Sequence, residues 1–93
     1  MRTIERTSQF KRDFKREMKG RNADRLESDL VVILRALAHD DPLPAKARDH
    51  GLTGDWIGHR DCHIRPDLVL IYRKPTPDIL QLVRLGSHSE LGL

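Results

Sequence analysis

Five consecutive residues, Leu68-Val69-Leu70-Ile71-Tyr72, are apolar or aromatic without interruption. A short run of this kind, with no alternation of polar residues, is typical of a central β-strand that is covered on both faces. The turn-forming segment Lys-Pro-Thr-Pro-Asp follows at residues 74–78, and residues 79–85 are again largely apolar. Proline and aspartate favour tight turns, so the pattern predicts a β-hairpin at the centre of a sheet.

The segment before this run, residues 56–65, alternates with a period of two, which predicts another strand. We expect Cys62 and Ile64, at even positions, to pack in the core. The odd positions are mostly ionisable and should face water or a functional site. They are His59, Asp61, His63 and Arg65.

The first 40 residues predict one short strand and two helices. The strand covers residues 2–7, and Ser8 can cap a helix that continues to about Lys19. A second helix covers about residues 23–39, and Pro42 breaks the helical pattern after it. The first helix has an apolar residue every fourth position. These residues are Phe10, Phe14 and Met18.

Taken in order, these elements predict an α+β fold in a single domain over residues 1–93. The strand, the two helices and the three hairpin-linked strands favour a small, mainly antiparallel sheet of about four strands, with the two N-terminal helices packed on one face. After the last strand, Gly86 releases a short tail that carries His88. A chain of 93 residues leaves little room for a deep pocket, so we expect an open groove.

The composition restricts the class of protein. No apolar run approaches the roughly 18 to 20 residues that a membrane-spanning helix needs, and the N-terminal residues lack the apolar core of a signal peptide. Cys62 is the only cysteine, which excludes an internal disulfide bond. We therefore expect a cytoplasmic protein with no membrane partner.

Positive charge is concentrated near the N-terminus. Residues 2–25 contain nine Lys or Arg and four Asp or Glu, whereas the whole chain has 17 and 14. Such an excess is typical of a surface that binds a polyanion, either nucleic acid or an acidic protein, although a solvated helix face is the simpler alternative. We expect three lysines of the first helix to make this contact with a polyanion. They are Lys11, Lys15 and Lys19.

Histidines and one aspartate suggest acid–base chemistry. The chain has five histidines, and His50, His63 and His88 lie in the predicted loop, strand and tail. Imidazole can accept and donate a proton near neutral pH, and Asp67 could orient one of the rings. This set suits metal-free cleavage of RNA, so we expect no cofactor and no metal. A metal site on the same side chains is the alternative, but no short spacing pairs two imidazoles as metal motifs usually do.

Three arginines are candidate phosphate contacts, because a guanidinium binds two phosphate oxygens and keeps its charge. They are Arg60, Arg65 and Arg84. Arg84 continues an apolar strand face, so an ion pair with Asp61 or Asp67 is the alternative interpretation.

Residues 49–72 resemble a family signature. They fit the pattern DH-x-L-x-G-x-W-x-G-x-RD-x-H-x-x-PD-x-x-LIY, and residues 84–88 fit R-x-G-[ST]-H. Both patterns are similar to those of the YafQ family, toxins of type II toxin–antitoxin pairs within the RelE/ParE superfamily. Two positions depart from the family pattern: His59, where Tyr is frequent, and Gly92, where members can carry an aromatic residue.

The resemblance implies a RelE-like fold and an endoribonuclease that cuts mRNA in the ribosomal decoding site without metal. It also implies a cognate antitoxin, which we expect to be acidic and labile. The family's functional positions fall on the residues already selected: His50, His63, Asp67 and His88. The alternative is a ParE-like toxin that inhibits DNA gyrase on the same fold and lacks this set of residues.

Overall fold

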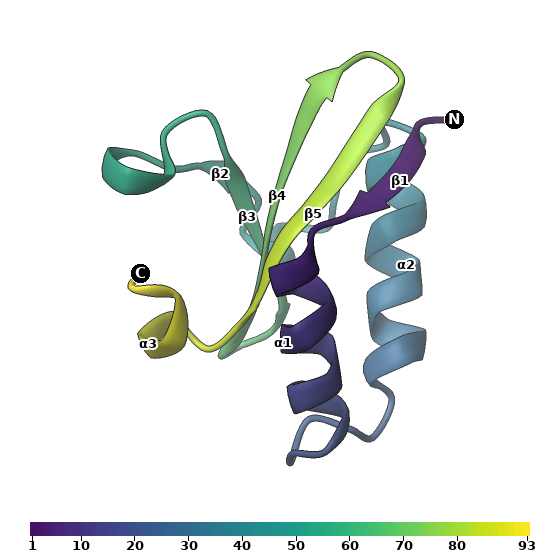
Figure 1. The fold of residues 1–93 in the computed structure, drawn as a ribbon. Helices are drawn as coiled ribbons and strands as arrows, with labels where there is room; N and C mark the ends of the chain where they lie inside the picture. Colours follow the sequence, from purple (N-terminus) through teal and green to yellow (C-terminus); the bar gives the residue numbers. More distant parts are fainter.

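The computed structural model describes residues 1–93 as three helices and one five-stranded sheet with the strand order β1-β5-β4-β3-β2 (Figure 1). The predicted α+β class is confirmed. In chain order the elements are β1 (Thr3–Arg6), α1 (Ser8–Met18), α2 (Leu26–Ala38), the 3-10 turn η1 (Ala45–Ala47), β2 (His50–Gly51), the 3-10 turn η2 (Gly54–Trp56), β3 (Arg60–Arg65), β4 (Leu68–Thr76), β5 (Ile79–Gly86) and α3 (His88–Leu91). None of the helices has the length and apolar composition that crossing a membrane requires.

The central strand is the one that the sequence predicts. Residues 68–72 of β4 are at most 1% exposed, and β4 pairs antiparallel with both β3 and β5. At one edge, β1 pairs parallel with β5. The sheet has five strands and not about four, because His50 and Gly51 pair with Asp61 and Arg60. A two-residue strand has no periodicity, so the sequence pattern could not reveal it.

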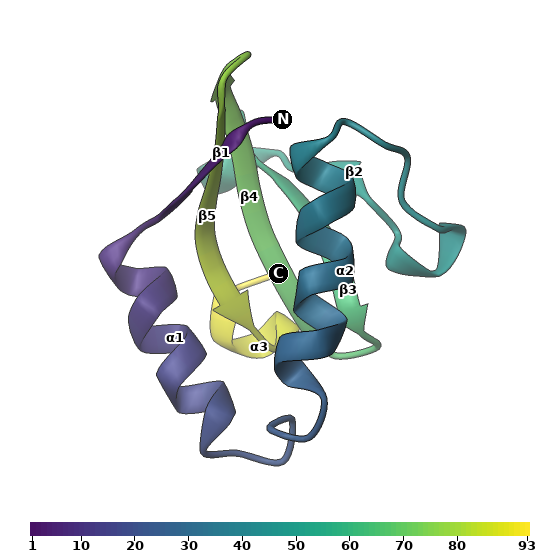
Figure 2. The ribbon, with the colours of Figure 1, turned by 90° about the vertical axis from the view of Figure 1, so that its right-hand side faces the viewer.

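The main core lies between the sheet and the first two helices. Leu26, Leu30 and Leu37 of α2 belong to one buried cluster with Leu70 of β4 and Leu82 of β5. Figure 2 shows α2 in front of the sheet, α1 to its left and α3 behind it, and Phe10 of α1 belongs to the same buried cluster. The prediction that both N-terminal helices cover one face is therefore confirmed.

A second, smaller cluster lies on the opposite face. It combines Val69 and Ile71 of β4 with Leu91 of α3, and Trp56 packs against it. Cys62 belongs to the main core, as predicted, and burial raises the pKa of its thiol to about 12. The thiol is therefore protonated at neutral pH and serves packing.

Both predicted helix starts need correction. Thr7, and not Ser8, caps α1, since its hydroxyl accepts a hydrogen bond from the Phe10 amide at 3.0 Å. The second helix begins at Leu26, three residues later than expected, because Arg25 adopts a left-handed conformation with φ 63°. Residues with positive φ do not continue a helix, and apolar periodicity alone does not report them.

The segment after β5 is a helix and not the released tail that the sequence suggested. Ser87 and Glu90 form a reciprocal capping box: the Ser87 hydroxyl accepts from the Glu90 amide, and the Glu90 carboxylate accepts from the Ser87 amide. Leu91 is buried against the sheet. Gly92 ends the helix with φ 70°, a conformation that disfavours the aromatic residue of the family pattern.

Candidate active site

The candidate site lies on the sheet face opposite α1 and α2. Successive side chains of a strand point to opposite faces, so Asp61 and His63 project away from Cys62, which is in the main core. Their neighbours on β4 are Ile71 and Val69, which belong to the smaller cluster. The predicted division into two faces is correct for Cys62, Asp61 and His63. It is wrong for Arg65, which pairs with Asp29 of α2 because the register shifts between His63 and Arg65. The strand also begins at Arg60 and not at residue 56.

His88 is held by Asp67, as the sequence analysis anticipated for one imidazole. Its Nδ1 lies 2.7 Å from Asp67 Oδ1, and its backbone amide donates to the same oxygen at 3.1 Å. These hydrogen bonds lower the pKa of Asp67, so this carboxylate stays charged. The Nδ1 hydrogen is thereby committed to Asp67, and Nε2 is the atom that can act on a substrate.

His63 lies next to His88. The two ring centroids are 5.0 Å apart with an edge-on angle of 73°. Burial lowers the pKa of His63, and the charge of His88 lowers it further. His63 is therefore suited to accept a proton at neutral pH.

Asp61 is the site residue that sequence reasoning missed. It is only 3% exposed, and its Oδ1 accepts no hydrogen bond. Burial raises the pKa of Asp61, while the nearby imidazoles of His50, His63 and His88 lower it. Its position two residues before His63 on the same strand face was the signal that could have identified it.

His50 completes the group from β2. Its Nδ1 lies 3.1 Å from Asp61 Oδ1 but hydrogen-bonds to the carbonyl oxygen of Arg48 at 2.7 Å. A carbonyl can only accept, so Nδ1 carries the hydrogen and Nε2 is free. The structure thus gathers the four predicted residues on one face of the sheet, although residues 50 and 88 are far apart in sequence. No group of three or more His, Cys, Asp or Glu side chains is arranged to hold a metal ion.

The three arginines predicted as phosphate contacts are all in ion pairs. Arg60 is near Asp49 at 3.3 Å and remains half exposed. Arg65 pairs with Asp29 of α2 at 3.2 Å. A carboxylate therefore balances the charge of each of these two arginines without a bound ligand.

Arg84 pairs with Asp13 of α1 at 2.8 Å, and the expected partners Asp61 and Asp67 were wrong. Asp13 is fully buried and also accepts from the Leu85 amide at 3.0 Å. Arg16 donates to the Leu85 carbonyl at 2.8 Å. Strand β1 does not pair with this end of β5. Polar side chains of α1 therefore hydrogen-bond the free backbone groups of β5 there, and the ion pair of Arg84 with Asp13 helps to attach α1 to β5.

The same attachment reaches the helix that carries His88. Arg16 of α1 lies 3.2 Å from the Glu90 carboxylate of α3. A Cβ on Gly86 would come within 2.9 Å of the Arg16 guanidinium and 3.2 Å of Glu90, so a side chain there would disturb this pair. A residue larger than glycine at position 86 would therefore require the Arg16 and Glu90 side chains to shift.

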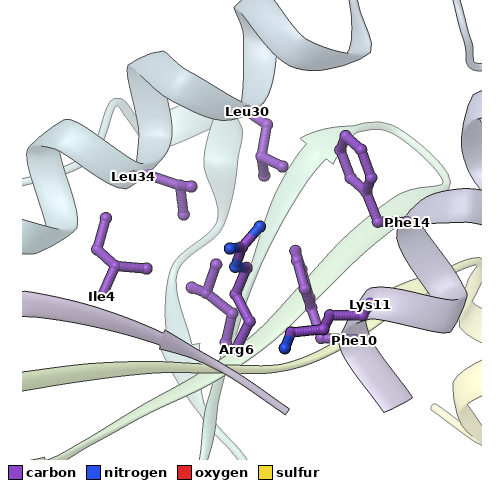
Figure 3. Close-up of a pocket in the computed structure, with 8 residues that line it drawn as sticks. Ile4, Arg6, Phe10, Lys11, Phe14, Leu30 and Leu34 are labelled. Atoms are coloured by element: carbon purple, nitrogen blue, oxygen red, sulfur yellow. The ribbon is translucent and has the colours of Figure 1, made fainter. Parts of the chain in front are cut away.

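The three lysines are exposed on α1 or at its C-terminal cap, and their side chains have no ion-pair or hydrogen-bond partner in the structure. They are Lys11, Lys15 and Lys19. Beside them, an apolar groove lies between β1, α1 and α2, and Arg6 and Lys11 are the basic residues in its lining (Figure 3). The groove contains no histidine or carboxylate, so its chemistry suits an amphipathic partner and not catalysis.

Comparisons with known proteins agree with this geometry. The sequence model of a bacterial toxin of type II toxin–antitoxin systems, YafQ, matches residues 2–92. The mRNA interferase toxin YafQ of Escherichia coli (strain K12) is 40% identical over 91 residues, which cover 97% of this chain and 95% of that protein.

Two solved structures have the same fold. YafQ in the E. coli DinJ–YafQ complex superimposes with a TM-score of 0.82 at 36% identity, covering 98% of each chain. A metal-bound toxin from Helicobacter pylori superimposes with a TM-score of 0.87 at 41% identity, covering 98% of this chain and 99% of that one. The family match, the near-complete coverage and the shared fold lead to one conclusion: the chain belongs to the YafQ family of type II toxin–antitoxin toxins.

Proposed function

We propose that this toxin is an endoribonuclease that cleaves mRNA in the ribosomal decoding site by metal-independent acid–base chemistry. The observation that carries the proposal is the group of three imidazoles beside Asp61, with His88 held at 2.7 Å by Asp67. The name of the E. coli relative, an mRNA interferase, supports the same reaction. The site of action would be the cytoplasm.

In the proposed reaction, His63 takes the proton from a ribose 2′-OH, because its lowered pKa keeps the ring neutral. The 2′-oxygen attacks the phosphorus, the bond to the 5′-oxygen breaks, and a 2′,3′-cyclic phosphate forms. Protonated His88 delivers a proton from Nε2 to the departing oxygen, while Asp67 orients the ring. His50 shares the transfer of protons through its free Nε2. Arg60, which is half exposed, is the candidate to stabilise charge on the phosphate.

We further propose two macromolecular partners besides the mRNA. The exposed lysines of α1 would contact ribosomal RNA. A labile, acidic antitoxin would silence the enzyme, by analogy with DinJ in the E. coli complex. The apolar groove with two basic residues in its lining supports an acidic, amphipathic partner.

The decisive experiment incubates the purified toxin with a translated messenger, with and without ribosomes. We expect cleavage only on ribosomes, unchanged by excess EDTA, with products that end in a 2′,3′-cyclic or 3′-phosphate. His88→Ala should slow single-turnover cleavage by about 10² or more, the usual contribution of a general acid or base. His39→Ala is the matched control, since His39 is exposed at the end of α2.

An equimolar amount of the cognate antitoxin should abolish the cleavage. Loss of activity in EDTA with rescue by zinc would replace the proposed chemistry with a metal mechanism. Intact messenger together with inhibited gyrase supercoiling would favour the ParE-like alternative.

A further inference from the structure

A groove with both charged and apolar lining runs along the outer edge of β3 and reaches His63. Strand β2 pairs only with Arg60 and Asp61, so the remainder of β3 has no neighbouring strand on that side. The groove occupies this place and lies between β3, α2 and η1. His63 is part of its lining, so the groove lies beside the strand residue that carries the proposed catalytic imidazole.

The groove carries uncompensated positive charge. Lys46 and Arg48 line it, both residues are exposed, and neither side chain has an ion-pair or hydrogen-bond partner in the structure. The acidic residue in the lining is Asp29, and its charge is balanced by Arg65 at 3.2 Å. Two positive charges thus remain beside the site. The charge of Arg48 also contributes to lowering the pKa of His63, which places the guanidinium within electrostatic reach of that ring.

Part of the groove lining is apolar. Val32 of α2 is 67% exposed and lines the groove, as do Pro44 and Pro66. An exposed valine in a groove that also carries Lys46 and Arg48 offers a surface on which a nucleobase can pack. A chain that combines regular negative charges with flat apolar faces would fit such a groove, and single-stranded RNA has both properties.

We propose that this groove binds the single-stranded RNA next to the scissile phosphate, with Lys46 and Arg48 contacting successive phosphates and Val32 packing against a base. The proposal rests on the proposed function, because it extends the RNA path from His63. It adds two residues, Lys46 and Arg48, that the sequence analysis did not select. It also assigns a use to the uncovered edge of β3.

The test measures binding without cleavage. The probe is a short, fluorescein-labelled single-stranded RNA with a 2′-O-methyl group on every ribose, which removes the attacking hydroxyl. Fluorescence anisotropy gives its affinity for the wild-type toxin, Lys46→Gln and Arg48→Gln over a range of KCl concentrations. Arg12→Gln is the matched control: it removes one positive charge from an exposed position on α1, which lies beside β5 and away from β3.

Each phosphate contact on a single strand contributes about 0.7 to the slope of log affinity against log salt. We therefore expect Lys46→Gln and Arg48→Gln each to reduce the slope by about 0.7 and to weaken binding about fivefold at 0.1 M salt. Arg12→Gln should bind like the wild type. Slopes and affinities of the two groove variants that equal those of the control would overturn the proposal.

Two further outcomes separate this proposal from the proposed function. If the groove variants lose RNA affinity but the wild-type toxin cuts no messenger on ribosomes, the groove stands and the nuclease activity fails. If the toxin cuts messenger and the groove variants bind RNA normally but lose affinity for the acidic antitoxin, the groove is a protein-docking surface and the RNA proposal is wrong.

Discussion

At the scale of the residue, Asp61 lowers the stability of the fold and lies among the three imidazoles of the candidate site. Its folded pKa is raised by burial above the value in the unfolded chain. A group shifted in this direction favours folding below its unfolded pKa, and this contribution is lost as the pH rises through the folded pKa. At neutral pH the buried carboxylate therefore destabilises the fold.

We predict that Asp61→Asn is more stable than the wild type at pH 7 and cleaves more slowly. Removing an unsatisfied buried charge is worth about 1 kcal/mol or more, which corresponds to an increase in Tm of about 4 to 8 °C. The difference should shrink as the pH falls towards the ordinary aspartate pKa of 3.8. Thermal unfolding from pH 4 to 8 and single-turnover cleavage measure both effects. Asp78→Asn, in the β4–β5 turn, is the control; an Asp61→Asn variant that loses stability at pH 7 would contradict the prediction.

At the scale of the element, α3 depends on its surroundings. A helix of four residues cannot be stable alone, because helix nucleation costs more than one turn returns. The capping box, the contact from Arg16 and the burial of Leu91 hold it against the sheet. Since α3 begins with His88, its order determines where that imidazole lies.

We predict that Ser87→Ala loosens α3 and lowers cleavage without unfolding the protein. Loss of an N-cap hydroxyl costs about 1 kcal/mol, so residues 88–91 should exchange their amide hydrogens about fivefold faster. Ser87→Thr should restore both slow exchange and activity. Ser89→Ala changes an exposed serine of the same helix that makes no hydrogen bond through its side chain, and it should behave like the wild type. Normal cleavage by Ser87→Ala would show that the cap does not position His88.

At the scale of the whole molecule, the sheet separates the two surfaces to which we assign catalysis and docking. The candidate site lies on one face, whereas α1, with its unpaired lysines, lies with α2 on the other (Figure 2). This separation suggests that docking and chemistry can be altered independently.

We predict that replacing Lys11, Lys15 and Lys19 together by Glu weakens association with ribosomes and reduces its salt dependence, since counterion release falls with each lost phosphate contact. On saturating ribosomes, the rate of the chemical step and its pH profile should not change, because the site lies on the other face. Cosedimentation at several salt concentrations and single-turnover cleavage measure the two properties. Unchanged ribosome binding would mean that these lysines only contribute to solubility.

The sequence by itself determined the features that depend on local periodicity. A continuous apolar run identified the central strand at residues 68–72, and alternation with a period of two separated Cys62 from His63. Turn residues identified the hairpin, and helical spacing identified both N-terminal helices. These patterns are readable because a helix or strand repeats its contacts every few residues.

Tertiary structure decided the features that depend on residues far apart in the chain. Asp13 and Arg84 form an ion pair across 71 positions, and no spacing predicts that contact. Burial of Asp61, pairing of the two-residue β2 and formation of α3 likewise depend on what packs against them. The sequence identified the four candidate catalytic residues. Only the folded sheet brings His50 and His88 near the same buried carboxylate, that of Asp61. The reason is that burial and contacts between distant side chains exist only once the sheet and helices have packed together.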